Sequence, residues 1–254
     1  MLAKFFLPPR GWALTLALYA VIATGTPPSG SHPNARTLVA DADAILNPSG
    51  IVRSRIRLEV DRQNEPTVIY SLEVLRQGSD LMRVNFLSPA RMRGQALLRR
   101  GESQWLYFPS MQRTLKVPRR QSLAGSDFSY GDILNINLVS EYEADYLGSE
   151  KDGQGRQICH LRLKAKNLEA TYDEIQYWVR CRDATPLRRE YFTKSGQKLK
   201  ILQYAGHDNH GMPLQWTMYS VLNPANATRI VIENISAATG VSEDVFSLSG
   251  LRQE

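Results

Sequence analysis

The chain has 254 residues, of which 31 are Lys or Arg and 25 are Asp or Glu, and its formal net charge is +6. With 43% hydrophobic and 22% charged residues, the composition is that of a globular protein, which excludes a wholly disordered chain. Basic and acidic residues are interleaved, so the pI of about 9.4 does not indicate a nucleic-acid binder. After residue 23, no run approaches the roughly 18 apolar residues of a membrane-spanning helix.

Residues 1–23 have the pattern of a secretory signal peptide. Lys4 and Arg10 provide the positive end, and the apolar run from Trp12 to Ala23 leads to the expected cleavage point. An uncleaved anchor helix is the alternative, although the run is short for one. No Cys lies near the cleavage point, so we expect no N-terminal lipid. Residues 24–35 are expected to form a flexible lead, and in a host with two membranes the protein would be periplasmic.

The first predicted element of the folded part is a short helix, Thr37 to Leu46, which Asn47-Pro48 would end. Alternation of apolar and polar residues then predicts about eleven or twelve strands joined by short turns. Such a meander is naturally antiparallel, with one apolar and one polar face. The predicted strands are residues 55–60, 68–75, 82–86, 95–99, 105–108, 142–147, 158–165, 174–179, 187–192, 199–205, 214–222 and 228–235.

Helical signals are few. Ser129 is a predicted N-cap, with Asp132 at the third helical position, for a helix that runs to Leu138. A weaker helical signal covers residues 242–246. One bent sheet with so few helices has an under-filled interior, which favours a cavity over a solid core. A tight double-layer sandwich is the alternative.

Residues 157–166 and 173–180 are predicted to form a hairpin whose turn is centred near residue 170; Cys159 lies on its first strand and Cys181 directly after its second. That centre places the two cysteines opposite each other. In an exported chain an even number of cysteines favours a disulfide, but a cross-strand bridge needs closer Cβ atoms than most facing pairs have. Two reduced, buried thiols are the equally weighted alternative. The absence of a Cys-x-x-Cys motif argues against a redox site.

The search for catalytic chemistry is largely negative. His207 and His210 share a predicted turn, but zinc normally needs three or four ligands and no third candidate is adjacent. Asp127 and Asp132 lie near a predicted helix start, where carboxylates more often cap than catalyse. No nucleophile elbow, phosphate-binding loop or zinc-protease motif is present. We therefore expect no enzyme activity, no metal and no cofactor.

Several motifs together resemble the LolA-like outer-membrane lipoprotein-sorting family. The distinctive stretch is Gly125-Ser126-Asp127-Phe128-Ser129-Tyr130-Gly131-Asp132, and the resemblance extends over residues 36–254. The other segments that carry it are 105–109, 113–117, 177–179, 186–191 and 244–246. The resemblance implies a mainly β fold in which one incomplete antiparallel barrel wraps over a few short helices and encloses an apolar cavity.

The resemblance also implies a function. Better-known relatives carry lipoprotein acyl chains across the periplasm, between a membrane transporter and an outer-membrane receptor. We therefore expect a carrier whose partners are a lipid or lipoprotein acyl chain, an inner-membrane lipid exporter and an outer-membrane acceptor, and not nucleic acid. The identity of the cargo is left open: it is a lipoprotein, another lipid or a hydrophobic substrate of an exporter. The alternative is a periplasmic sensor that detects lipids or lipoproteins and signals to a membrane protein.

Two groups of residues are the candidates for the site. The segment around residues 128–134 is expected to form a lid over the cavity. The full set of cavity and lid candidates is Phe86, Trp105, Tyr107, Phe128, Tyr130, Ile133, Leu134, Trp178 and Tyr191. An electropositive rim for anionic head groups is expected from Arg91, Arg93, Arg119 and Arg120. The alternatives are that the aromatic side chains belong to the core and that the arginines form an ordinary solvated face.

Overall fold

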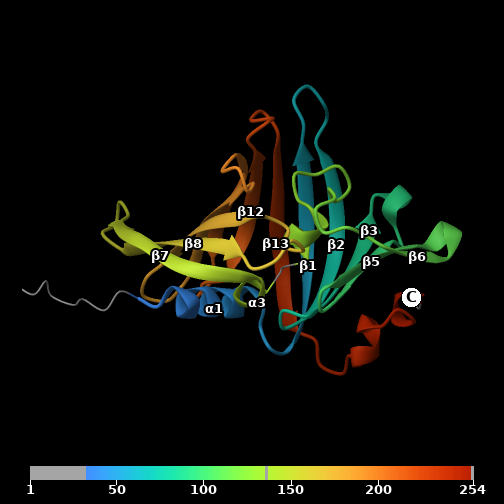
Figure 1. Ribbon diagram of the computed structural model, residues 1–254. Coiled ribbons are helices and arrows are strands. Elements are labelled where there is room, and N and C mark those ends of the chain that lie inside the picture. Colours follow the sequence, from blue (N-terminus) through green and yellow to red (C-terminus); the bar gives the residue numbers. More distant parts are fainter. Residues whose placement is uncertain (1–32, 135–136, 253–254) are drawn as a thin grey trace, which may run out of the picture. The chain divides into compact units, whose positions relative to one another are not determined.

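The computed structural model describes residues 33–134 and 137–252. The predicted signal peptide and nearly all of the predicted lead lie outside these residues. The described chain forms one 13-stranded antiparallel sheet and three α-helices (Figure 1), which confirms the predicted mainly β, incompletely closed fold. No helix among the described residues is long and apolar enough to span a membrane.

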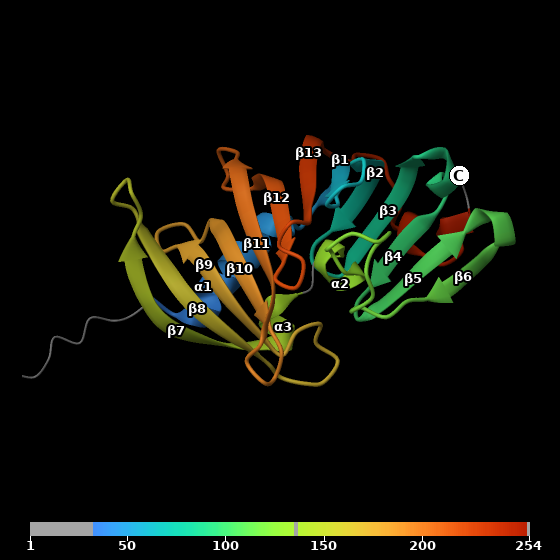
Figure 2. The same ribbon diagram turned by 90° about the horizontal axis from the view of Figure 1, so that it is seen from above.

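The sheet consists of two meanders that meet at β1 and β13. Its strand order is β6-β5-β4-β3-β2-β1-β13-β12-β11-β10-β9-β8-β7, so β6 and β7 are the two edges (Figure 2). The strands are β1 (Ile51–Asp61), β2 (Val68–Gln77), β3 (Leu81–Ser88), β4 (Ala96–Arg100), β5 (Ser103–Phe108), β6 (Arg113–Lys116), β7 (Tyr142–Lys151), β8 (Gln157–Ala165), β9 (Glu174–Arg180), β10 (Pro186–Phe192), β11 (Lys198–His207), β12 (Pro213–Ser220) and β13 (Ala227–Ala237).

The strand count exceeds the expected eleven or twelve because β6 was not predicted from alternation. This edge strand has four residues, of which only Leu115 is apolar, and the Leu115 side chain is 48% exposed. It is held by its pairing with β5, in which Leu106 faces Leu115. A strand whose side chains bury so little has no hydrophobic period to detect.

Helix α1 (Ala35–Leu46) confirms the first predicted helix. Asn34 caps it, because its Oδ1 accepts a hydrogen bond from the Thr37 N–H at 3.1 Å. Leu38, Ala42 and Leu46, spaced four residues apart, lie on one face and are buried in the main core. Figure 1 shows α1 beside β7 and α3, against which it packs.

The predicted continuous helix from Ser129 to Leu138 is wrong. Helix α2 covers only Tyr130–Ile133, and α3 (Leu138–Glu141) is a separate helix; residues 135–136 lie outside the described chain. The physical reason is a second cap, since the Asn137 side chain accepts a hydrogen bond from the Ser140 N–H at 3.1 Å and starts a new helix. The expected start is correct: Ser129 and Asp132 form a capping box.

Replacing Ser129 by Ala should lower the free energy of unfolding by about 1 kcal/mol, because it removes a buried N-cap. Urea denaturation measures this loss. Ser242→Ala is the matched control: Ser242 also caps a short helix, η3 (Glu243–Phe246), but this cap is exposed. An equal loss in the two variants would contradict the importance of the buried cap.

A second, smaller core lies on the face of the sheet opposite to the main core. Leu75 and Leu98 point to this face, where Phe246 and Leu251 cover them. The C-terminal segment is fixed there by Arg83, whose guanidinium donates to the Gly250 carbonyl at 2.7 Å. The last turns, η3 and η4 (Gly250–Arg252), therefore act as an outer cover for β3 and β4.

Candidate ligand-binding groove

A groove of about 640 Å³ lies between α1 and the centre of the sheet. Its volume falls within the roughly 300–1,000 Å³ of typical ligand sites. Its sheet wall comes from β1, β2, β12 and β13. The rest comes from α1 and Pro48 after it, from one residue of α2, and from the turns that precede β10 and β12. The apolar residues that line it are Ala44, Ile45, Pro48, Val52, Ile56, Val74, Ile133, Met212, Trp216, Ile230, Ile232 and Ile235.

The periodicities of the elements explain how these side chains meet. Val52, Ser54 and Ile56 alternate along β1 and therefore share one face of the sheet. In the register of the neighbouring strand, Ile56 lies opposite Ile232. On α1, Asp41, Ala44 and Ile45 follow helical spacing and line the groove next to the face that enters the core, and Pro48 lines it just after the helix. Helix α1 is thus both a core element and a groove wall.

Arginines from the sheet hold the ends of the helical segments. The Arg76 guanidinium donates to the Leu46 carbonyl at the C-terminus of α1, where a positive charge is favourable. Burial lowers the pKa of Arg76 to about 10, which leaves it charged at neutral pH. Arg99 donates in the same way to the Leu134 carbonyl after α2, at 2.8 Å.

A buried polar cluster lies beneath α1. The Arg189 guanidinium donates to the Tyr177 hydroxyl at 3.1 Å and is 3.9 Å from the Asp43 carboxylate. Asp43 in turn accepts a hydrogen bond from the Leu138 N–H at 2.8 Å, which ties α1 to α3. Burial raises the pKa of Asp43 to about 6, although Arg189 and the backbone bond oppose this rise. Burial likewise raises the pKa of Tyr204, which faces Arg189.

Among the predicted cavity and lid residues, Ile133 lines the groove. Four others, Phe86, Phe128, Tyr130 and Leu134, are buried in the main core. Tyr191 is also buried, with its ring 4.2 Å from that of Tyr172. The segment 128–134 thus lies under the sheet, but of its side chains only Ile133 lines the groove. Its action as a lid stays a prediction.

The remaining aromatic candidates lie elsewhere. Trp105 and Tyr107 pack against the second core, on the opposite face of the sheet from the groove. The half-buried Trp178 stacks on His160 at a centroid distance of 4.2 Å, and the Arg188 guanidinium lies 5.2 Å from its ring. These three residues do not line the groove.

The four arginines of the predicted rim do not line the groove either. Arg91 and Arg93 are exposed around η1 (Ala90–Met92), between β3 and β4. Arg119 forms an ion pair with Glu141 at 2.7 Å, and both side chains are largely buried. Arg120 donates to the Ala170 carbonyl at 2.8 Å. Two of the four arginines are thus tied into the fold, and a rim for anionic head groups stays a prediction.

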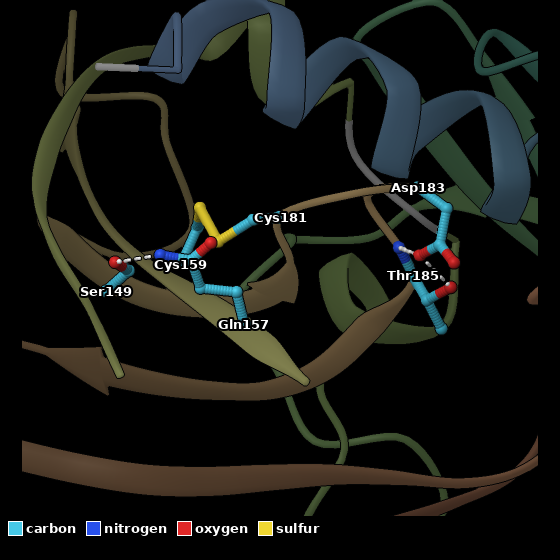
Figure 3. The surroundings of a disulfide bond; sticks show 6 residues. All are labelled: Ser149, Gln157, Cys159, Cys181, Asp183 and Thr185. Carbon is cyan, nitrogen blue, oxygen red and sulfur yellow. Dashed lines mark hydrogen bonds between the residues drawn. A yellow bond between two sulfur atoms is a disulfide. The ribbon is translucent and has the colours of Figure 1, made fainter. Parts of the chain in front are cut away.

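The two cysteines form a disulfide (Figure 3). The predicted register is wrong by two residues, because Cys159 faces Val179 and not Cys181. Cys181 lies just beyond β9, where its N–H donates to the Gln157 carbonyl at 2.9 Å. The reason is that the hairpin turn is centred one residue earlier than its sequence pattern indicates. The bridge therefore runs diagonally across the two strands, with 5.0 Å between the Cα atoms.

The polar residues of the groove were not predicted as a group. Asp41, Asp183, Asp208 and His210 line it from α1 and from two turns of the sheet. His207, by contrast, uses Nε2 in a 2.7 Å hydrogen bond with the Pro186 carbonyl. No cluster of three or more His, Cys, Asp or Glu side chains suited to a metal occurs within residues 33–134 and 137–252.

Comparisons with known proteins agree with the fold. A family model with the description "-like: Uncharacterized protein" matches residues 78–253. A LolA superfamily protein of Nitrosomonas europaea matches with a TM-score of 0.77 and 23% identity, over 85% of this chain and 98% of that one. A domain of Vibrio parahaemolyticus named for outer membrane lipoprotein sorting matches with a TM-score of 0.76 and 20% identity, over 86% and 98%.

A DUF1329 family protein of Desulfovibrio piger is similar to the same degree, with a TM-score of 0.76, 23% identity and coverage of 85% and 97%. No curated protein matches the sequence. At these identities the structural matches establish a shared fold, while the ligand has to be argued from the groove itself.

Proposed function

The chain belongs to the family whose model matches residues 78–253 and has the LolA superfamily fold, and on this premise we propose that it is a periplasmic carrier of acyl chains. The cargo would be a lipid or the lipid part of a lipoprotein. The carrier would take it from an inner-membrane exporter and deliver it to an outer-membrane acceptor. The relative named for outer membrane lipoprotein sorting supports this direction.

The observation that carries the proposal is the apolar groove beneath α1. Transfer of a 16-carbon chain into water costs on the order of 12 kcal/mol, at about 0.8 kcal/mol per methylene. A carrier has to offset most of this cost, and the aliphatic side chains of β1, β2 and β13 offer the required surface. Binding of this kind needs no reaction, which fits a non-enzymatic protein.

Release requires that the groove can open. Helix α1 forms one wall, and a small number of polar contacts fix it: Arg76 at its C-terminus and the Asp43 bond to α3. Movement of α1 away from β1 and β13 would expose the bound chain to an acceptor. We propose that α1, more than the segment 128–134, is the movable wall.

Filling the groove tests the carrier function directly. Ala44→Trp places an indole ring on the groove face of α1, and it should weaken the binding of a neutral fluorescent probe, N-phenyl-1-naphthylamine, at least about tenfold. Arg36→Trp is the control, because Arg36 is exposed on α1 and does not line the groove. Circular dichroism checks that both variants are folded. Equal probe affinity in the two variants would refute binding in this groove.

A further inference from the structure

We propose that the groove selects amphiphiles whose polar end is cationic, such as a primary ammonium, over those that end in a carboxylate or phosphate. The inference rests on the proposed carrier function and specifies the chemical class of its ligand. It assigns the opposite preference to the groove from the one that the predicted arginine rim implies.

Three carboxylates from separate elements line the groove: Asp41 on α1, Asp183 in the turn between β9 and β10, and Asp208 in the turn between β11 and β12. Asp41, Asp183 and Asp208 are all exposed at its surface. Within residues 33–134 and 137–252, none of the three forms an ion pair. Their negative charges are therefore available to a ligand.

The two turns are fixed beside each other. His207 is hydrogen-bonded to the Pro186 carbonyl at 2.7 Å, which joins the end of β11 to the start of β10. Gly211 has a φ of +81°, and a Cβ atom at this position would lie 2.9 Å from the Thr185 Oγ1 atom. This close approach requires glycine and holds the Asp208 turn against the Asp183 turn.

The internal hydrogen bonds of each turn leave one carboxylate oxygen unused. Oδ1 of Asp183 accepts from both the N–H and the hydroxyl of Thr185 (Figure 3). Oδ1 of Asp208 accepts from the N–H groups of His210 and Met212. In both residues Oδ2 takes no part in these bonds, so a bound ammonium group can reach it. The pKa of Asp183 lies below its ordinary value. Partial burial acts to raise it, but the Thr185 hydrogen bonds and the nearby Arg180 and Arg182 lower it by more.

The positive charges near the groove do not reverse this balance. Arg76 is the only Lys or Arg among the described residues that line it, and its guanidinium is engaged with the Leu46 carbonyl. Arg180 and Arg182 act on Asp183 but do not line the groove. Counting its three Asp and one Arg side chains, the lining has an excess of two negative charges. A carboxylate or phosphate that entered this apolar site would lose hydration and meet like charges.

Three amphiphiles with the same 12-carbon chain and different ends test the inference. Dodecylamine, dodecanol and dodecanoate, each below its solubility or micelle limit, compete with N-phenyl-1-naphthylamine at pH 7. Dodecylamine should displace the probe at a concentration at least about tenfold lower than dodecanoate, with dodecanol in between. In the Asp41→Asn, Asp183→Asn, Asp208→Asn triple variant, the ratio should approach one while the affinity for dodecanol stays the same.

Asp145→Asn is the control variant, because Asp145 is an exposed acid on β7 that does not line the groove. It should keep the wild-type ratio. Equal or tighter binding of dodecanoate in the wild type, or a ratio unchanged in the triple variant, would overturn the inference while dodecanol binding still supports a carrier. If neither the probe nor dodecanol binds, the proposed function and this inference both fail.

Discussion

Arg189→Met should lower the free energy of unfolding by about 3 kcal/mol at pH 7, because it removes a charge-assisted hydrogen bond to Tyr177 and leaves Asp43 to take up a proton in the core. The Arg189 side chain is almost fully buried beneath α1, where it donates to Tyr177 and lies near the Asp43 carboxylate. Without Arg189, the Asp43 carboxylate keeps the Leu138 and Val139 N–H groups and the charge of Arg99, and burial then favours its protonated form. Urea denaturation of the wild type and the variant measures the difference.

The pH dependence of this loss follows from the pKa of Asp43. In the folded protein it is about 6, against an ordinary value of 3.8, so the folded state binds the proton more tightly than the unfolded state does. Asp43 therefore opposes folding as the pH rises from about 4 to 6, by on the order of 3 kcal/mol. Its ionised form is the one that needs Arg189. The loss in Arg189→Met should be smaller at pH 5 than at pH 7.

Asp43→Asn provides the matched control, because the amide oxygen can still accept the Leu138 hydrogen bond. This variant should be at least as stable as the wild type at pH 7 and should lose the pH dependence between 4 and 6. The double variant Asp43→Asn, Arg189→Met should lose less stability than Arg189→Met alone. A loss in Arg189→Met that is the same at both pH values and unrelieved by Asp43→Asn would show that packing alone explains the role of Arg189.

Removal of the disulfide is the second change with a large expected effect. Cys159 and Cys181 are separated by 22 residues, and closing a loop of this size stabilises a fold by about 3 kcal/mol in the chain-entropy model. Cys159→Ala, Cys181→Ala should therefore lower the free energy of unfolding by about that amount. Dithiothreitol should destabilise the wild type to a similar extent and leave the double variant unchanged. Two titratable thiols in the oxidised wild type would contradict the bridge.

The strands were predictable because most of them bury one face. In β1, for example, Ile56, Leu58 and Val60 are buried while the residues between them are not. The edge strand β6 lacks this contrast. The Ser129 cap was also predictable, because Ser129 and Asp132 bond to each other within three residues. The end of α2 was not predictable, because the Asn137 side chain accepts a local hydrogen bond from the Ser140 N–H and thereby starts a new helix.

The residues that line the groove could not be predicted from the sequence, because its walls come from distant segments. Ile56 and Ile232 become neighbours only through the pairing of β1 with β13. The strongest local signals, large aromatic side chains, indicated burial correctly but not its location: Phe128 is in the main core, and Trp105 packs on the opposite face. Arg119 was an expected rim residue, but an acid 22 positions later, Glu141, neutralises it.

The pairing of β1 with β13 also determines when the groove can form during folding. Val52 pairs with Ala237, so the centre of the sheet closes only when the last strand is present. That strand supplies Ile230, Ile232 and Ile235 to the groove. Eleven strands, β2 to β12, lie between β1 and β13 in the chain. If the chain folds from its N-terminus, one edge of β1 stays unpaired while these strands form, and apolar surface is exposed to other chains meanwhile. Until β13 is in place, the open edge of β1 can pair with other chains, and the groove lacks three of its apolar residues.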